Sequence, residues 1–248
     1  MRIRSGIGAA LAGALALALM AGVAAAATIT GDDGDNVLTG TPTADQIDAQ
    51  GGNDTVSALG GPDLVAAGEG NDLVDAGAGR DRVRGGPGND TIAGGPGHDS
   101  IAGGQDDDTI DGGEKADRIL GQAGNDQLAG GAGRDLLRGR EGDDRESGGE
   151  GADMMFAGPG VDVLDGGAGD DVIFARARAD VPVSGADTVF GGQGDDVIVV
   201  RDGEADVVGC GSGHDLVIAD SQDVTRPSCE RVRVGEPRPG DDSSEVGS

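Results

Sequence analysis

The chain has 248 residues, of which 51 are Gly and three are aromatic, all of them Phe, so it lacks the material for an ordinary globular core. Its 46 acidic and 18 basic residues give a formal charge of -28, which disfavours nucleic acid and anionic membrane surfaces as partners and favours cations. This composition leaves either a repeat architecture or a disordered chain, and periodicity decides between them.

Residues 1–27 are typical of a signal peptide. Arg2 and Arg4 form a basic start, an Ala- and Leu-rich run covers residues 11–20, and Ala25 and Ala27 form an A-x-A cleavage site. An uncleaved anchor is the alternative, but the apolar run is short and no basic stop-transfer cluster follows it. We therefore expect a secreted, extracellular or surface-associated protein with no membrane span. Its mature charge would be -28 - 2 = -30.

Residues 31–174 divide into sixteen consecutive nonapeptide rows without an insertion or deletion. The sixth place is Asp in fifteen rows, with Asn36 as the exception, and the eighth is aliphatic or Met in fifteen, with Glu146 as the exception. The fourth place is Gly in thirteen. Rows 85–93 (GGPGNDTIA) and 94–102 (GGPGHDSIA) are the clearest copies. Low-complexity bias does not concentrate Asp at one place in nine, so the phase is specified.

These rows resemble the haemolysin-type, or repeats-in-toxin (RTX), nonapeptide G-G-x-G-x-D-x-U-x, where U is a large apolar residue. The resemblance covers residues 31–218. It implies an all-β fold, a right-handed parallel β-roll (β-helix solenoid) of about ten coils over residues 28–218. Two rows form one coil in this family, so residues 18 apart should stack.

The spacing also suits a calcium site. Gly at the first, second and fourth places permits tight turns, and x-U-x is a short strand with one apolar and one wet face. Stacked Asp carboxylates repel one another unless a hard cation lies between them, and calcium accepts irregular oxygen shells more readily than magnesium. The alternative for each Asp is an Asx-turn without an ion. We expect folding coupled to Ca²⁺, from a largely disordered calcium-free chain, with these ligands: Asp54, Asp63, Asp72, Asp81, Asp90, Asp99, Asp108, Asp117, Asp126, Asp135, Asp144, Asp153, Asp162, Asp171, Asp187, Asp196 and Asp215.

Several rows depart from the pattern. Row 40–48 has lost its turn glycines and should be a degenerate cap, as the uncharged Asn36 also indicates. Asp106 and Lys115 replace the fourth-place Gly and should strain their turns, and the Lys115 ammonium should weaken a nearby ion. Glu146 places a carboxylate where the apolar residue belongs, which predicts a local defect.

The register changes after Phe174. Residues 175–190 number two fewer than two rows, with Asp180 and Asp187 at plausible Asp places and Pro182 at a strand place. Asp206 follows in a ten-residue row.

The C-terminal end should be closed by residues 219–234 as a cap, and residues 235–248 should form a disordered tail. A disulfide between Cys210 and Cys229 is favoured over two free thiols in an exported protein. Phe156 and Phe174, 18 residues apart, should stack on the outside of one sheet, continuing towards Leu120. We expect the segment 221–234 to fold back over them rather than leave a patch for a partner.

No enzyme is expected. His98 and His214 occupy the variable fifth place, and neither H-E-x-x-H nor G-x-S-x-G occurs. A calcium-dependent structural or adhesive extracellular module fits best. The alternatives are a calcium-dependent protein that binds carbohydrate or another cell-surface ligand, and a remnant of an RTX toxin or hydrolase without its effector domain. Exposed Trp or Tyr, usual in carbohydrate sites, and a regular outward Thr ladder, expected of an ice binder, are both lacking in the sequence.

Overall fold

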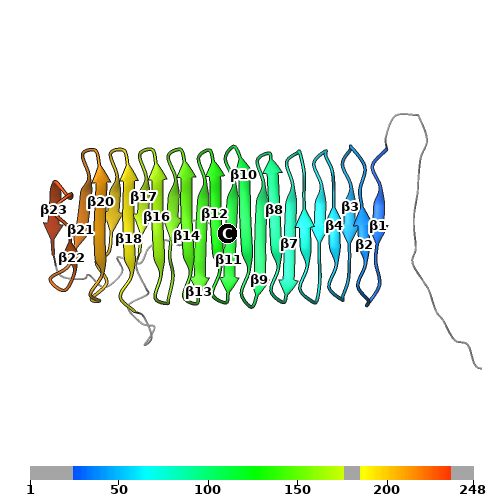
Figure 1. Cartoon of the computed structure of the whole chain (residues 1–248), viewed down its shortest axis with the longest axis horizontal. Coiled ribbons are helices and arrows are strands. Elements are labelled where there is room, and N and C mark those ends of the chain that lie inside the picture. Colours follow the sequence, from blue (N-terminus) through cyan, green and yellow to red (C-terminus); the bar gives the residue numbers. More distant parts are fainter. Residues whose placement is uncertain (1–24, 176–184, 236–248) are drawn as a thin grey trace, which may run out of the picture.

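The structure is a computed structural model that describes residues 25–175 and 185–235. It is an all-β parallel solenoid whose successive strands alternate between two sheets (Figure 1). The chain advances from β1 at one end to β23 at the other, so the two ends of the described chain lie far apart (Figure 1). Residues 1–24 of the predicted signal peptide (1–27) and residues 236–248 of the predicted tail (235–248) lie outside the described residues.

One sheet, here called sheet A, contains twelve strands: β1 (Thr28–Thr30), β3 (Gln46–Asp48), β5 (Leu64–Ala66), β7 (Arg82–Pro87), β9 (Ser100–Gln105), β11 (Arg118–Ala123), β13 (Leu136–Glu141), β15 (Met154–Phe156), β17 (Val172–Phe174), β19 (Val197–Val199), β21 (Leu216–Ala219) and β23 (Arg231–Val234). The other, sheet B, contains eleven: β2 (Val37–Thr39), β4 (Thr55–Ser57), β6 (Leu73–Asp75), β8 (Thr91–Pro96), β10 (Thr109–Glu114), β12 (Gln127–Ala132), β14 (Arg145–Glu150), β16 (Val163–Ala168), β18 (Thr188–Gln193), β20 (Val207–Ser212) and β22 (Val224–Thr225).

The register confirms the two-row coil. Ile110 on β10 pairs with Ile92 on β8 and Leu128 on β12, each 18 residues away. The strands give about eleven coils, one more than expected, because β1 precedes the first full row and β22 and β23 continue the sheets beyond residue 218.

The core is a file of eighth-place side chains from β3 to β21, such as Ile47, Ile92 and Leu137, with Glu146 on β14 as the polar exception. Alternation along the strand turns these residues inwards and the seventh and ninth places outwards. The first place also points inwards, since Ala49 and Ala58 are fully buried there. The repeat pattern did not indicate this second inward position, because most rows carry Gly at it.

The irregular region after Phe174 holds one row with an insertion. β18 follows β17 in the chain, and the backbone N–H of Asp162 donates to the Oδ1 of Asp187, 25 residues later (2.8 Å). The normal step is 18 residues, so 25 - 18 = 7 residues are inserted. The expectation of two shortened rows is therefore wrong. Asp180 and Pro182 lie outside the described residues.

The C-terminal segment continues the solenoid instead of folding back. β22 pairs with β20 and β23 with β21, so the expected cover over Phe156 and Phe174 is not formed by this segment. Arg226 does cover Phe190, at 5.3 Å from the ring centroid, but on sheet B. A Cys210–Cys229 disulfide joins the segment to β20, as expected. Within the described residues, no helix has the length and apolarity to cross a membrane.

Candidate metal centre

The sixth-place carboxylates form two columns along the solenoid. Each Asp directly precedes a strand, and strands alternate between sheets, so successive rows feed different columns. We call the column before the strands of sheet A column A and the other column B. Column A contains Asp45, Asp63, Asp81, Asp99, Asp117, Asp135, Asp153, Asp171, Asp196 and Asp215; column B contains Asp54, Asp72, Asp90, Asp108, Asp126, Asp144, Asp162, Asp187 and Asp206.

Both columns are buried. All seventeen Asp residues predicted as ligands are at most 4% exposed. One oxygen of each, Oδ1, accepts a hydrogen bond from the backbone of the preceding coil at 2.7–3.1 Å, as when the Asp126 N–H donates to Asp144. These bonds hold the carboxylates of one column in line, one per coil. The sequence prediction that residues 18 apart stack is confirmed here.

The second oxygen, Oδ2, has no such partner. Among the described residues, Oδ2 is buried and without a hydrogen-bond partner in sixteen of the seventeen predicted ligands, all except Asp187, and in Asp206 as well. A buried acceptor left unsatisfied costs about 1–3 kcal/mol, and more when charged. So regular an arrangement of orphaned carboxylate oxygens fits a column of bound cations, because a cation supplies the missing partner.

Backbone carbonyls face the same places. A Cβ atom added to Gly148 would lie 2.5 Å from both the Oδ2 of Asp153 and the carbonyl oxygen of Gly166, one coil further on. At Gly130 the corresponding distances to Asp135 Oδ2 and Gly148 O are 2.6 and 2.5 Å. A carboxylate and a carbonyl oxygen thus converge beside a glycine that leaves the space open. Both are the hard oxygen ligands that calcium takes.

The side chains alone do not form a metal site. Within the described parts of the chain, no group of three or more His, Cys, Asp or Glu residues is arranged to hold a metal. Each turn contributes one buried carboxylate to its column, so backbone carbonyl oxygens would complete the ligand set of any ion bound there. This matches calcium, which accepts carbonyl ligands freely, better than zinc, which prefers Cys and His side chains.

Burial raises the pKa of the column carboxyls. The pKa rises to about 9 for Asp187 and about 8 for Asp144, chiefly through desolvation, with neighbouring carboxylates adding to it and the backbone hydrogen bond opposing it. It rises to about 7 for Asp162 and about 6 for Asp90, again mainly through desolvation. Without cations, the folded roll would therefore hold protons at neutral pH. A divalent cation removes the need for them.

The N-terminal rows differ, as their sequence predicted. Asp45 satisfies both oxygens, because Oδ1 accepts from the Ala27 N–H (2.6 Å) and Oδ2 from the Thr41 N–H (2.5 Å). The side-chain oxygen of Asn36 accepts from Asp32 N–H (2.7 Å), within its own turn. These first rows have the closed hydrogen bonding of a cap.

The columns reach further towards the C-terminus than the ligand set predicted from the sequence. Asp206, assigned to an irregular row but left out of that set, is fully buried and carries an orphaned Oδ2. Asp223 accepts from the Asp206 N–H (3.2 Å), and Glu230 accepts from the Asp215 N–H (3.0 Å). Spacings of 17 and 15 residues hid them from a nonapeptide count. The sequence signal that could have found both residues is an acidic residue one or two places before an apolar one.

The turns at Asp106 and Lys115 are strained, as the sequence predicted. Asp106 and Lys115 have φ angles of 72° and 75°, in the left-handed region that favours Gly. Burial raises the pKa of Asp99, and the positive charge of Lys115 opposes that rise. His98 and His214 are exposed.

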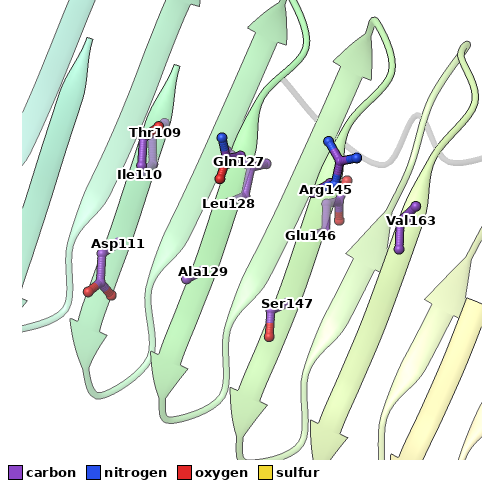
Figure 2. A pocket seen from close by; sticks show the side chains of 10 residues that line it. All are labelled: Thr109, Ile110, Asp111, Gln127, Leu128, Ala129, Arg145, Glu146, Ser147 and Val163. Atoms are coloured by element: carbon purple, nitrogen blue, oxygen red, sulfur yellow. The ribbon is translucent and has the colours of Figure 1, made fainter. Parts of the chain in front are cut away.

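Glu146 is the predicted defect. It is 3% exposed, its Oε1 accepts from the Gly139 N–H (2.7 Å), and its Oε2 is buried without a hydrogen-bond partner in the described chain. Burial, together with the charge of Asp144, raises its pKa well above the usual range. It lines a depression across β10, β12, β14 and β16 (Figure 2).

Comparison with known families agrees with this geometry. The profile described as RTX calcium-binding nonapeptide repeat (4 copies) matches residues 23–56, 30–65, 49–83, 57–92, 84–119, 111–146, 147–181 and 183–204. The chain belongs to this family. It is an RTX calcium-binding repeat protein, and the columns A and B are built from its repeat aspartates.

A comparison with curated protein sequences gives no match to this RTX chain. Among solved structures, a hyperactive, Ca²⁺-dependent, β-helical antifreeze protein from an Antarctic bacterium is 18% identical, with a TM-score of 0.33. The alignment covers 85% of this chain and 83% of that one. The antifreeze activity is stated for that protein, and a similarity at this level carries no argument about the function of this chain.

Proposed function

We propose that this RTX chain is a secreted protein that folds when calcium binds along columns A and B, and that it serves outside the cell as a structural or adhesive module. The observation that carries the proposal is the run of buried, orphaned Oδ2 atoms, sixteen of them in the predicted ligands. Asp54, Asp63 and the other sixth-place aspartates of that set would hold the ions, with turn carbonyls beside them.

The rest of the chain supports coupling between binding and folding. The core is one file of aliphatic side chains with a row of small first-place residues, and it has no aromatic member among the described buried residues. The acidic side chains behind the formal charge of -28 repel one another in so narrow a body. Calcium removes that repulsion and satisfies the orphaned oxygens in the same step, so binding free energy becomes folding free energy.

A calcium titration tests this proposal. The metal-free chain should give the far-ultraviolet circular dichroism of a disordered polypeptide and a large radius in X-ray scattering. Both should convert together to a strand-rich, elongated particle as calcium is added. Magnesium at the same concentration is the control and should convert far less. Spectra unchanged by calcium would overturn the proposal.

Secretion and adhesion need separate tests. Cell fractionation of the full chain should place a shortened product outside the cytoplasm, with its N-terminus near Thr28. A product that keeps residues 1–27 would contradict the predicted cleavage. Cell-binding and glycan-array measurements with and without calcium distinguish adhesion from a passive structural role: calcium-dependent retention on cells supports adhesion.

A further inference from the structure

The outer face of sheet A differs in charge from the rest of the molecule. From β7 to β23 it presents eighteen outward side chains, at the seventh and ninth places of nine strands. Six are Arg, ten are large apolar residues, and the other two are Ser100 and Ala102. None is acidic, although the chain has 46 acidic and only 18 basic residues. The carboxylates adjacent in sequence, such as Asp81 and Asp117, are buried in column A, and Glu230, beside Arg231, accepts a hydrogen bond from the Asp215 N–H (3.0 Å).

The residues fall into two ladders in strand register. The seventh-place ladder is Arg82, Ser100, Arg118, Leu136, Met154, Val172, Val197, Leu216 and Arg231. The ninth-place ladder is Arg84, Ala102, Leu120, Arg138, Phe156, Phe174, Val199, Ile218 and Arg233. We call these two ladders together the arginine face. Arginines lie at both ends of it, and an apolar strip lies between them.

The six arginines make no ion pair in the described chain. Arg138 lies 5.0 Å from the ring centroid of Phe156, which stacks on Phe174 at 4.9 Å. Burial, with the positive charges of Arg118 and Arg140 nearby, lowers the pKa of Arg138. These guanidinium groups therefore have apolar and like-charged neighbours, although acidic side chains far outnumber basic ones in the chain.

The strip is partly exposed. Met154 is 38% exposed, and Leu136, Val172 and Leu216 are half-buried, while Val199 is buried. An ordinary wet sheet face would carry polar residues at such positions. The neighbouring strands β10, β12 and β14 of sheet B do so: Thr109, Gln127 and Arg145 form one row and Asp111, Ala129 and Ser147 another (Figure 2). The apolar, arginine-rich character is therefore particular to the outer face of sheet A, and the repeat itself does not require it.

We propose that the arginine face docks on an anionic phospholipid bilayer. A solenoid sheet is extended and continuous, so it can meet a planar surface along nine strands at once. Arginine pairs bidentately with phosphate, and partly exposed Leu, Met and Val gain from contact with the acyl boundary. The docking rests on the proposed calcium-driven folding, because calcium also offsets the acidic charge of the turns that would repel such a membrane.

Other partners fit less well. A second copy meeting this face about a two-fold axis would bring the Arg118 end of one molecule against the Arg231 end of the other, and the like charges would repel. An acidic polysaccharide could pair with the arginines but offers no apolar surface to the ten large apolar residues of this face. A bilayer offers both phosphate and an apolar interior.

Vesicle co-sedimentation in saturating calcium tests the proposal. The probe is phosphatidylcholine vesicles with and without phosphatidylglycerol. The chain should sediment with the anionic vesicles and remain in solution with the neutral ones. Arg118→Glu should lower partitioning about tenfold or more, since each basic residue near an anionic surface contributes about 1 kcal/mol. Arg145→Glu is the matched control: an equally exposed seventh-place residue on sheet B with the same charge change. It should bind within about twofold of the unaltered chain.

The Arg118→Glu variant also detects calcium bridging between turn carboxylates and lipid phosphate. Bridging would leave Arg118→Glu binding unchanged or strengthened, and either result overturns the proposal. Equal binding to neutral vesicles, or a dimer that Arg118→Glu dissociates, would also overturn it. Circular dichroism of each variant in calcium confirms folding, and Arg231→Glu with Arg233→Glu repeats the test at the other end. A chain that fails to fold with calcium refutes the proposed function; a folded chain that ignores anionic vesicles refutes only the docking.

Discussion

Replacing Glu146 by Leu should stabilise the folded protein. Glu146, on β14, lies in the file of inward side chains. Its partners in register are Leu128 on β12 and Leu164 on β16. It is 3% exposed, and its Oε2 is buried without a hydrogen-bond partner among the described residues. Leucine restores the residue type of both neighbours and removes that oxygen.

The expected magnitude follows from three contributions. Removing an unsatisfied buried polar atom is worth about 1–3 kcal/mol. The better apolar fit adds about 1 kcal/mol, close to one buried methylene. Loss of the hydrogen bond that Gly139 N–H donates to Oε1, now 2.7 Å long, costs about 1 kcal/mol. The net gain in unfolding free energy is therefore about 1–3 kcal/mol.

Urea unfolding at saturating calcium measures this gain. The midpoint of Glu146→Leu should rise while the slope stays constant. Glu150→Leu, at an exposed position of the same strand, is the control and should change stability by no more than about 0.5 kcal/mol. Glu146→Gln keeps an acceptor for Gly139 and should fall between the two. A Glu146→Leu variant that is less stable than the unaltered chain would refute the reasoning, and would show that the Glu146 carboxylate has a ligand of its own.

Three further predictions follow from the columns and the disulfide. Asp135→Asn should reduce the number of calcium ions measured by calorimetry, whereas Asp111→Asn, on the outer face of sheet B, should not. Reducing the Cys210–Cys229 bond, which spans 19 residues, should lower the unfolding free energy by about 3 kcal/mol in a denaturant titration in calcium. The raised pKa values, up to about 9 for Asp187, mean that the calcium-free fold is stabilised by protons; that stability is full below about pH 4 and is lost as pH rises through about 6 to 9. Acidifying the calcium-free chain should therefore increase its strand content in circular dichroism.

Each of these has a contradicting outcome. Equal calcium stoichiometry for the Asp135 and Asp111 variants would show that the columns are not the calcium-binding sites. A stability unchanged by reduction would show that β22 and β23 hold to the roll without the disulfide. A calcium-free chain that loses strand content on acidification would reverse the sign of the proton linkage.

The nonapeptide period predicted most of the fold. The Asp90 and Ile92 places recur without a gap over sixteen rows, and a two-row coil then fixes strand, register and column. The period fails where rows change length. Steps of 25, 19 and 17 residues near the C-terminus arise from changes in the length of chain between paired strands, and such connections tolerate changes in length. Asp223 and Glu230 were missed for that reason.

The chemistry of the outer faces was missed for a different reason. Successive rows enter different sheets, so the seventh and ninth places pooled over all rows are a mixture of Thr, Ala, Asp, Arg and Leu. When alternate rows are considered separately, their outward residues divide between the two sheets. Arg118 and Met154 then belong to one face, and Thr109 and Arg145 to the other. The outward residues thus repeat every 18 places, whereas the turn and core residues repeat every nine.

Anomalous scattering from a crystal grown in calcium tests the central claim most directly. The account predicts a series of anomalous peaks along columns A and B, each within bonding distance of an Asp Oδ2 and of turn carbonyl oxygens, from Asp54 through Asp171. The series should weaken at the Asp45 cap, whose oxygens are already satisfied. Columns without peaks, with Oδ2 atoms bonded instead to water or protonated against a carbonyl, would contradict it.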